Sequence, residues 1–406
     1  MANTFQNTSL ASGLAELKNF YQGPIVDQFN NEVPIYRGAE KGKHPWSGQV
    51  VKRPLRVRRN QGIGATSDGG NLPQIGRQVP VQAEISAKYN YLRFGITAPM
   101  IAASKNDVGA FVRSAAYELE QGYEDLKQDV NRQMGWDGTG DLALVNTAAV
   151  GSTSLVIKGR EDTEPALKFV DVGLQFDIYN GSTLVQAGVT VSAISSGDAS
   201  SATATLTLDS AVTASAGYVL VRAGSYGQEV QGLLTQLDGA TSTVYGLVRA
   251  DYVQLQGNVV DKNAAVLSLD DWQKAQDEAE RRGGIINAIY CDYASRRMYQ
   301  KLLTADKRYS NTMKGDGGFA NKDQSYLEWN GLPIVADKDA PTRIFMLPEK
   351  HIEKYILEEM AFADETGSMY IAQSDVDAFE VRIRLFMNMF NAKASASAVI
   401  MDYVTP

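Results

Sequence analysis

The sequence has little of the chemistry on which enzymes rely. Among its 406 residues are one cysteine, Cys291, and two histidines, His44 and His351. A single cysteine cannot form a disulfide within the chain, which favours a reducing compartment. The histidines lie far apart, and neither HExxH nor GxSxG occurs, so the signatures of zinc proteases and serine hydrolases are absent. We therefore expect no enzyme, with no catalytic residues, no metal and no cofactor.

Long apolar runs are also lacking. No run approaches the roughly 20 apolar residues that a membrane-spanning helix needs, and the N-terminal MANTFQNTSLASG has neither a basic residue nor a continuous apolar core. It does not look like a secretory signal. With 44% hydrophobic and 21% charged residues, the composition is that of a globular chain. We expect two or three domains at roughly 150 residues each, and no membrane partner.

Positive charge is scarce except in one segment. The formal net charge is −8, yet residues 37–59 contain eight lysines and arginines and one acid, which gives them +7 and leaves −15 for the rest. Such a distribution is not typical of a general nucleic-acid binder. A chain with one basic arm and an acidic body can instead attract other copies of itself.

The basic segment runs into the glycine-rich stretch GIGATSDGGN. Gly64 and Gly69 have the spacing of a Walker loop, but Gly70 and Asn71 stand where the loop needs lysine and serine or threonine. Ser67 likewise replaces the third glycine of a dinucleotide motif, and no βαβ pattern surrounds it. The glycines are therefore interpreted as a bend and not as a phosphate site.

On either side of this stretch, the pattern predicts the two strands of a long hairpin. VVKRPLRVRR mixes apolar and basic residues, and QVPVQAEISAKYNYLRFGIT places apolar side chains on alternate positions from Val79 to Tyr91. A strand of about 15 residues spans on the order of 50 Å. Because a hairpin of this kind is marginally stable alone, we expect it to lie on another surface.

The basic side chains of this hairpin have two interpretations. Nucleic-acid binding needs phosphate-contacting cations together with stacking aromatic residues, and aromatic residues are absent from Val50 to Lys88. Docking on an acidic protein surface fits the pattern better. The candidate contact residues are Lys52, Arg53, Arg56, Arg58 and Arg59.

Periodic patterns predict the helices. Apolar residues recur every three or four positions from Val108 to Met134, which predicts a helix of about 28 residues that ends in GWDGTG, with Gly135 and Gly138 as left-handed stops. Before the hairpin, the sequence predicts a short helix at 9–21 and then an irregular arm interrupted by prolines. These prolines are Pro24, Pro34 and Pro45.

Residues 147–224 differ in composition from the rest of the chain. Ser, Thr, Ala, Gly and Val dominate, and short alternating strands with turn signals between them predict a small β-barrel or sandwich. Helices and strands mix beyond it: a helix in SLDDWQKAQDEAERRGG capped by Ser268, a buried strand in IINAIYC, a helix in DYASRRMYQKLL, short strands in NGLPIVAD and RIFMLP, and strand-like alternation in FEVRIRLF. The predicted fold class is α+β with an inserted β-rich domain.

In this order, the elements resemble the major capsid proteins of tailed double-stranded DNA phages, which have the Hong Kong 97-like fold. LKNFYQGPIVDQFNNEVPIYRG looks like the N-terminal arm of that family, the hairpin like its extended loop (E-loop), and NDVGAFVRSAAYELEQGYEDLKQDVNRQMGWDGTG like its spine helix and glycine turn. The resemblance implies these parts: N-terminal arm 1–46, E-loop 47–99, peripheral domain with spine helix 100–146, β-rich insert 147–224, axial domain and return 225–375, and C-terminal peripheral-domain strands 376–406.

The resemblance implies a structural protein of the virion capsid that assembles in the host cytoplasm. Copies of the chain would form pentamers and hexamers that close into an icosahedral shell around packaged double-stranded DNA, without specific contacts to the DNA. A portal, and either a separate scaffolding protein or none, would be further partners, and some members also carry a decoration protein. The short segment before the E-loop implies that no N-terminal part is cleaved.

The resemblance also implies roles for particular residues. The basic side chains of the hairpin would meet acidic side chains on the spine helix of a neighbour. One member of the family crosslinks an E-loop lysine to a neighbour's asparagine; Lys52 and Asn330 lie in suitable regions, but no motif here supports a crosslink. The candidate acidic partners are Glu118, Glu120, Glu124 and Asp125.

Two other interpretations stay open. An encapsulin-like shell protein of a cellular nanocompartment has the same fold, although such chains are usually shorter and lack a β-rich insert. A β-rich tail or adhesin protein would account for residues 147–224, but not for the long helix and the mixed C-terminal half.

Overall fold

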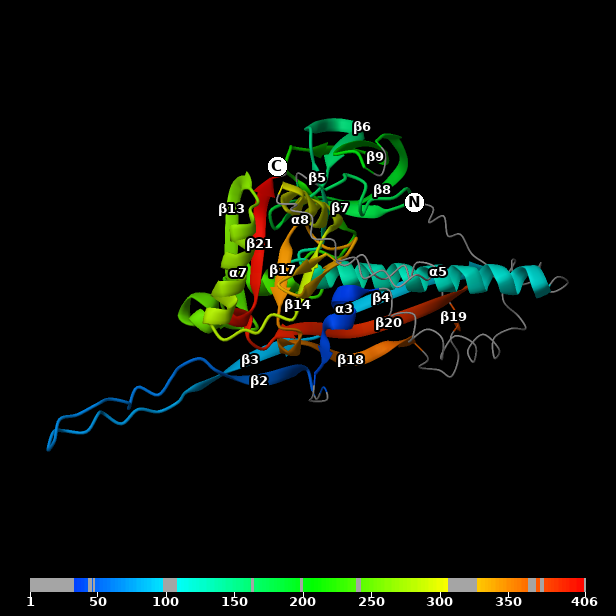
Figure 1. The fold of residues 1–406 in the computed structure, drawn as a ribbon. Coiled ribbons are helices and arrows are strands. Elements are labelled where there is room, and N and C mark those ends of the chain that lie inside the picture. Colours follow the sequence, from blue (N-terminus) through cyan, green and yellow to red (C-terminus); the bar gives the residue numbers. More distant parts are fainter. Residues whose placement is uncertain are drawn as a thin grey trace, which may run out of the picture.

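The computed structural model describes residues 33–42, 46, 48–97, 108–161, 164–197, 200–238, 242–305, 327–363, 370–372 and 376–404. The helix predicted at 9–21 lies outside these residues. Figure 1 shows a body that contains sheets, the long helix α5 and a β-barrel, and a hairpin that projects from it.

Helix α5 (Val108–Gly135) has the extent that the sequence predicts. In its C-terminal half, side chains three and four positions apart face the core, which is the pattern of an amphipathic helix on a sheet. These buried residues are Tyr123, Leu126, Val130 and Met134.

The turn that follows α5 corrects one part of the prediction. Gly138 has the expected positive φ of 78°, but the second left-handed position is Gly140, with a φ of 92°, and not Gly135. Gly135 is needed for close packing instead, because a Cβ there would lie 3.2 Å from Cδ of Pro341.

The first sheet packs against α5 through a shared core. Its central strand β20 pairs with β4 along one edge and with β18 and β19 along the other, and β1 adds to β18 in parallel. The alternation predicted in FEVRIRLF is confirmed, since Val381, Ile383 and Leu385 are buried. The strands are β1 (Glu40–Lys41), β4 (Lys88–Thr97), β18 (Ile352–Phe362), β19 (Tyr370–Ala372) and β20 (Ala378–Asn391).

The irregular arm predicted before the hairpin is wrong for its last part. Helix α3 (Pro34–Gly38) is a short helix with buried Ile35 and Tyr36. Pro34 stands at the start of this helix, where its missing N–H is not needed and its fixed φ suits the first turn. The proline therefore starts a helix here and does not interrupt one.

The hairpin consists of strands β2 (Val50–Arg56) and β3 (Pro80–Ser86) in antiparallel register. The single long strand predicted from Val79 onward is wrong, because β3 pairs with β2 while the next strand, β4, pairs with β20. The change of partner strand also changes the burial of the alternate side chains. Ala83 and Ile85 are fully buried, whereas Tyr89 and Tyr91 are about half exposed.

A closed barrel occupies the chain from Asp141 to Arg222. Of the two predicted architectures, barrel and sandwich, the structure has the barrel, and its first strand begins before residue 147. Its interior holds apolar side chains such as Leu155, Phe176 and Leu206. The strand order is β10-β5-β6-β9-β8-β7, with β5 (Asp141–Val145), β6 (Ala149–Lys158), β7 (Gln175–Asn180), β8 (Thr183–Ser196), β9 (Thr203–Ala214) and β10 (Val219–Arg222).

A six-stranded sheet in the order β13-β21-β17-β14-β16-β15 forms the rest of the body. Helix α7 packs on it through Trp272, and Ser268 caps this helix through a capping box with Asp271, as the sequence predicts. The elements are β13 (Asn258–Val266), α7 (Leu269–Arg281), β14 (Ala288–Cys291), α8 (Tyr293–Ala305), β15 (Glu328–Trp329), β16 (Leu332–Ala336), β17 (Ile344–Leu347) and β21 (Ala398–Val404).

Short elements lie between the barrel and the six-stranded sheet, or connect the two sheets to each other. They are α6 (Leu233–Leu237), β11 (Thr243–Val244), β12 (Leu247–Val248) and the 3₁₀ turns η2 (Arg249–Asp251), η3 (Val253–Leu255), η4 (Glu349–His351) and η5 (Ala394–Ala396). No helix in the described ranges combines the length and the apolar character needed to cross a membrane.

Candidate assembly surface

The hairpin continues into a loop that projects from the body. Residues 57–79, which we call the projecting loop, contain no strand or helix and extend away from the other elements in Figure 1. At the tip, the Gly70 amide donates a hydrogen bond to the Ser67 carbonyl at 2.9 Å. Farther back the two branches lie close together, since a Cβ on Gly62 would be 2.7 Å from the Gly76 nitrogen. The glycines thus let two chain segments run side by side away from the protein.

Three large apolar side chains of the projecting loop are almost fully exposed. The exposed fractions of Ile63, Leu72 and Ile75 are 85%, 85% and 102%. Fully burying one such side chain is worth about 1.5–3 kcal/mol. Exposed apolar groups gathered on one feature mark a contact surface more often than a free one, so the projecting loop is a candidate interface.

The structure divides the five basic candidates into two groups. Lys52 pairs with Glu84, its cross-strand partner in the hairpin, at 2.9 Å, and Arg53 pairs with Glu353 at 3.2 Å. These two side chains are therefore occupied within the chain. The remaining three are exposed, and none forms an ion pair with another residue of the described ranges; they are Arg56, Arg58 and Arg59.

The acidic candidates lie on α5. Glu124 is half-buried and Asp125 is exposed, while the side chains of Glu118 and Glu120 lie outside the described part of the helix. Their contact with the hairpin of another copy stays a prediction. Asn330 occupies the turn before β16 with a φ of 47°, and its side chain donates to Oε1 of Gln276 at 2.8 Å.

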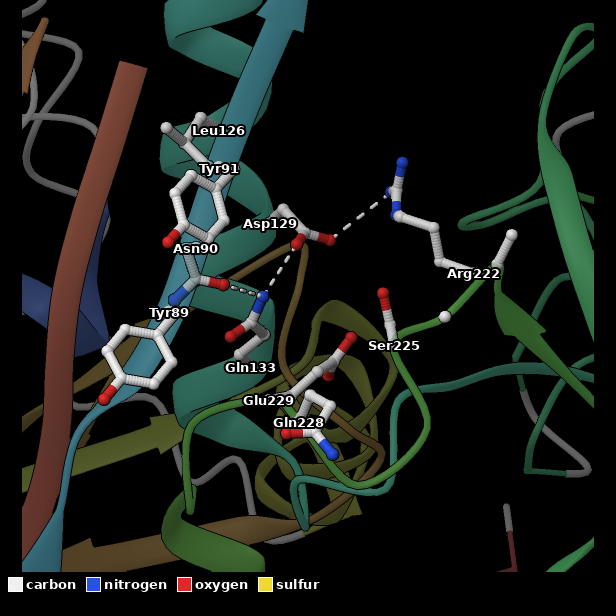
Figure 2. Close-up of a pocket in the computed structure, with 12 residues that line it drawn as sticks. Tyr89, Asn90, Tyr91, Leu126, Asp129, Gln133, Arg222, Ser225, Gln228 and Glu229 are labelled. Atoms are coloured by element: carbon white, nitrogen blue, oxygen red, sulfur yellow. Dashed lines mark hydrogen bonds and ion pairs between the residues drawn. The ribbon is translucent and has the colours of Figure 1, made fainter. Parts of the chain in front are cut away.

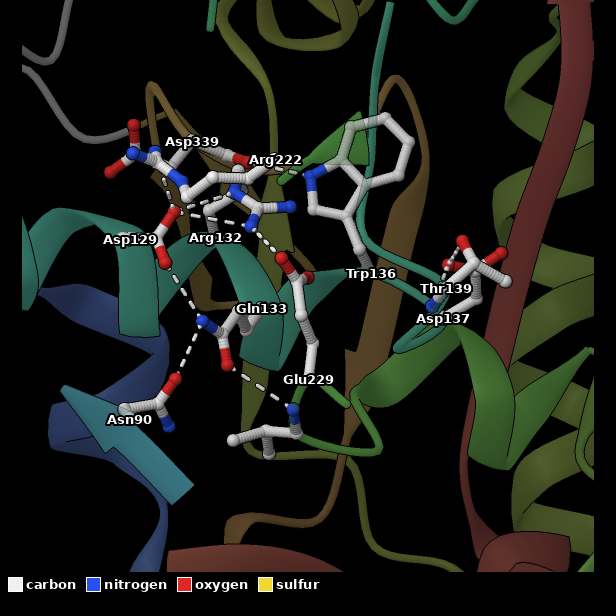
Figure 3. Close-up of polar contacts among 11 residues, drawn as sticks. Asn90, Asp129, Arg132, Gln133, Trp136, Asp137, Thr139, Arg222, Glu229 and Asp339 are labelled. Atoms are coloured by element: carbon white, nitrogen blue, oxygen red, sulfur yellow. Dashed lines mark hydrogen bonds and ion pairs between the residues drawn. The ribbon is translucent and has the colours of Figure 1, made fainter. Parts of the chain in front are cut away.

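A network of charged side chains joins α5 to the barrel. Figure 3 shows Arg132 of α5 between Asp129 and Glu229, with Nε of Arg132 donating to Oδ1 of Asp129 at 3.1 Å and Nη2 to Oε1 of Glu229. Both Arg132 and Glu229 are nearly inaccessible, with side chains 3% and 5% exposed. Arg222 approaches the same Asp129 oxygen at 3.4 Å from the end of the barrel. We call this set the polar junction.

Gln133 extends the polar junction to the first sheet. Its amide donates to Oδ1 of Asn90 on β4 at 2.9 Å and to Oδ2 of Asp129 at 2.8 Å, and its carbonyl accepts from the Val230 amide at 3.1 Å. One side chain of α5 thus holds β4 and the chain leaving the barrel. A cavity of about 440 Å³ opens beside it, between β4, α5 and residues 222–229 (Figure 2).

Burial and charge act in opposite directions in the polar junction. Burial alone would raise the pKa of Asp129, but the positive charges of Arg132 and Arg222, together with hydrogen bonds from Gln133 and Arg132, outweigh it and lower that pKa. For Glu229, burial prevails over the attraction of Arg132 and raises the pKa. Breaking a buried pair by removing one partner costs several kcal/mol, so Arg132 is the side chain on which the stability of this junction depends most.

A second set of contacts fastens the barrel to the end of α5. Arg160, in the loop after β6, pairs with Asp137 and lies over the Trp136 ring at 4.2 Å. Phe169 meets the same tryptophan edge to face, with ring centroids 6.2 Å apart. Trp136 also donates from Nε1 to the Asp339 carbonyl at 3.1 Å. Trp136 is 1% exposed, so these contacts shield its ring from water at the seam between barrel and body.

The single thiol and the acidic side chains can be compared with the geometry that reactive and metal sites require. Cys291 is fully buried, and burial raises the pKa of its thiol, which keeps it from forming the nucleophilic thiolate. Across the described ranges, no three His, Cys, Asp or Glu side chains are grouped so that they could hold a metal ion. The contacts described above join the barrel, α5 and the first sheet to one another.

Solved structures with a similar fold exist, although no family model and no curated protein matches the chain. A chain in the capsid asymmetric unit of cyanophage A-1(L) superposes with a TM-score of 0.57 at 12% identity, covering 92% of this chain and 93% of that one. The chain has the fold of a phage capsid protein. The predicted resemblance to phage capsid proteins is thereby confirmed for the fold, and its assignment to the Hong Kong 97-like type stays a prediction.

Two other solved structures match the chain with lower TM-scores. The capsid of a native GTA particle matches with a TM-score of 0.49 at 8% identity, over 100% of this chain and 95% of the other. The holo-SrpI encapsulin complex from Synechococcus elongatus PCC 7942 matches with a TM-score of 0.46 at 8% identity, over 100% and 93%.

Sequence patterns missed the residues that join the barrel to the body. Arg132, Glu229 and Arg160 carry no motif, and their partners lie far away in sequence, so only the folded chain brings them together. The exposed apolar residues of the projecting loop could have been found, since Ile63, Leu72 and Ile75 stand among glycines and polar residues with no alternation to bury them.

Proposed function

We propose that this protein is the major capsid protein of a phage with the Hong Kong 97-like fold, and that its copies assemble into an icosahedral shell around double-stranded DNA. The observation that supports this most is the projecting loop, which exposes apolar side chains that another copy of the chain can bury. The capsid-protein fold supports the same proposal. No reactive centre is needed, because repeated contacts between identical copies build a closed shell.

Ile63, Leu72 and Ile75 lie on either side of the turn at Ser67–Gly70, and we call these three side chains the apolar tip. The apolar tip contributes more to this contact than the arginines do. Burying Ile63, Leu72 and Ile75 is worth about 1.5–3 kcal/mol each, so roughly 5–9 kcal/mol per loop before ordering costs. An exposed ion pair adds only about 0–1 kcal/mol. Arg56, Arg58 and Arg59 would therefore guide the loop toward an acidic surface such as Glu124 and Asp125 of a neighbour's α5, while the tip holds it there.

The proposal assigns the parts of the chain as the resemblance implies. The projecting loop with β2 and β3 acts as the E-loop, α5 as the spine helix, and the barrel as an insert between peripheral and axial regions. A portal and, where present, scaffolding and decoration proteins would be further partners. The acidic body is suited to a container whose inner surface does not hold DNA tightly.

Two loop variants test the proposal. Leu55 and Val81 are directly paired in the hairpin, and unlike Pro80 both have a backbone N–H. Replacing residues 56–80 with Asn-Gly therefore closes the hairpin with a two-residue turn and keeps the pairing of β2 with β3 from Val50 to Leu55. A second variant changes Ile63, Leu72 and Ile75 to serine and keeps the loop length. We expect the unchanged chain to sediment as particles of megadalton size and both variants as single subunits or small oligomers.

The matched control changes three exposed polar positions of the same loop, Gln61→Ser, Thr66→Ser and Gln74→Ser, and should assemble like the unchanged chain. Normal particles from the Asn-Gly variant would rule out the loop as the assembly contact. Nuclease-protected DNA inside particles from infected cells separates a viral capsid from a nanocompartment shell, which would enclose protein and no genome-length DNA.

A further inference from the structure

Where the hairpin leaves the body, it rests on a small apolar cluster of its own. Val51 of β2 and Ala83 and Ile85 of β3 are buried there, at 8%, 0% and 0% exposure. They pack against side chains of the body, with which they form one cluster that is separate from the main core. The body residues of this cluster are Val244, Tyr245, Tyr355 and Phe390.

Strand β2 is tied to β18 by an ion pair at this root. Nη2 of Arg53 lies 3.2 Å from Oε1 and 3.5 Å from Oε2 of Glu353. The hydroxyl of Tyr355 donates to Oε2 of the same carboxylate at 2.7 Å. The side chains of Arg53 and Glu353 are 24% and 11% exposed. The pair is thus largely shielded from water, and one oxygen of Glu353 is held by both the hairpin and its own strand.

Strand β3 is tied to the body on the other side. The amide of Glu84 donates to the Tyr245 carbonyl at 2.9 Å, and the side-chain amide of Asn388 donates to the Ser86 carbonyl at 2.7 Å. Tyr245 adopts a φ of 53° and accepts from the Asn391 amide through its hydroxyl at 3.1 Å. Each strand of the hairpin is therefore bonded to the body, β2 by the ion pair and β3 by backbone and side-chain hydrogen bonds. A hairpin that moved freely relative to the body would lack such contacts.

We propose that Arg53 and Glu353 form a root clamp that fixes the direction of the projecting loop in the free subunit, before any other copy is met. This deepens the proposed function and rests on it for its biological meaning. A loop that already points in the right direction loses less conformational freedom on binding. Arg53 is then a positioning residue and not a contact residue for the neighbour, unlike Arg56, Arg58 and Arg59.

The length of the projecting loop makes the root clamp important for assembly, because a small rotation at the root displaces distant side chains by several ångströms. From Arg56 to Ile63, and from Pro80 back to Leu72, seven or eight extended residues span roughly 25 Å at about 3.3 Å each. A rotation of about 20° at the root would move these side chains by roughly 9 Å, which exceeds the ~4 Å separation of side chains in contact. A small loss of order at the root would therefore remove Ile63, Leu72 and Ile75 from their acceptor.

The direction of the hairpin can be measured on single subunits. The only cysteine is buried, so spin labels attach selectively to new cysteines at two exposed positions, Gln82→Cys on β3 and Lys274→Cys on α7. Serine at Ile63, Leu72 and Ile75 in the same background removes the assembly contact. We expect one narrow distance distribution for the parent, and loss of that narrow distribution for Arg53→Ala and for Glu353→Gln.

Lys52→Ala is the matched control, because Lys52 is the next residue of the same strand and pairs within the hairpin. It should leave the distribution narrow. The charge exchange Arg53→Glu with Glu353→Arg should restore a narrow distribution, which a general loss of folding would not. A distribution for Arg53→Ala as narrow as the parent's, or one that Lys52→Ala broadens equally, would overturn the proposal.

Assembly provides the second measurement. With the apolar tip restored and no labels, Arg53→Ala should yield incomplete or irregular shells and the charge exchange should recover closed ones. If the unchanged chain forms no shells, the proposed function fails while the distance measurement still decides the clamp. If closed shells form equally well from Arg53→Ala, the clamp is not needed for aiming the loop.

Discussion

The seam between barrel and body contains a carboxyl group whose titration can be tested directly. Glu161 is 13% exposed and lies 3.0 Å from Nη1 of Arg343, but Nη2 of Arg343 lies 3.2 Å from Asp402. One guanidinium thus serves two carboxylates. Burial raises the pKa of Glu161 to about 7, because the attraction of Arg343 is too weak to compensate and Glu164 adds a like charge.

The other charged groups near Glu161 do not reverse this shift. Arg160 and Lys168 lower its pKa by smaller amounts, and the buried phenol of Tyr403 lies close enough to be affected by Glu161 in turn. Arg160 is itself engaged by Asp137, and Lys168 by Glu164. Each cation near Glu161 is therefore already paired with another carboxylate.

The sign of the pH effect follows from the raised pKa. Between its ordinary value of 4.5 and about 7, Glu161 keeps its proton in the folded chain and loses it in the unfolded chain. The free energy of unfolding therefore falls as the pH rises through this window. Above the window the loss stays constant, so Glu161 adds no further dependence on pH. At 1.36 kcal/mol per pKa unit, the full effect is about 3 kcal/mol.

Glu161→Gln removes the titration and keeps the shape of the side chain. Relative to the parent, this variant should gain about 2–3 kcal/mol of stability between pH 5 and pH 8. Denaturant unfolding at both pH values measures it, in the background where Asn-Gly replaces residues 56–80, so that assembly does not contribute. Glu280→Gln, at an exposed position of α7, is the control and should show no such gain.

The reasoning would be refuted if Glu161→Gln and its parent lost stability equally between pH 5 and pH 8. It would also be refuted if Glu161→Gln were less stable than its parent and this deficit were larger at pH 8 than at pH 5. That result would mean that the ion pair with Arg343 outweighs the cost of burying Glu161.

Three further predictions concern the polar junction, the thiol and the barrel. Arg132→Met leaves Asp129 and Glu229 without their shared cation and should lower the free energy of unfolding by about 3–5 kcal/mol. Arg222→Met, at a side chain 49% exposed, should lower it by less than about 1 kcal/mol. Denaturant titration distinguishes the two variants. Cys291 should react with a thiol reagent only after denaturation, and fast reaction of the native chain would contradict its burial. Because Asp141 and Val221 are paired, replacing residues 141–222 with a short Gly-Ser linker should leave a folded body with Trp136 exposed, seen as a red-shifted tryptophan emission; an unfolded product would show that the barrel is not a separable insert.

Local patterns in the sequence predict the regular elements well. The periodicity of α5 and the capping box at Ser268 depend on residues within one or two turns, so the chain determines them without distant partners. The exposed apolar tip also needs no partner within the subunit. For such features, sequence and structure agree closely.

Features that depend on distant partners could not be predicted. The alternation from Val79 to Tyr91 suggested one strand, because period two does not reveal which strand pairs with which. Pro34 looked like an interruption, since its role at a helix start depends on the residues that follow it and on packing against α5. Arg53 looked like a surface charge, and only the fold brings Glu353, 300 residues later, beside it.

Electron cryomicroscopy of assembled particles would show whether the projecting loop joins neighbouring copies. We expect closed icosahedral shells in which residues 57–79 of each copy lie across a neighbouring copy, with Ile63, Leu72 and Ile75 buried at that contact. Shells in which this loop touches only its own subunit, or a purified chain that stays a single subunit at all concentrations, would contradict it.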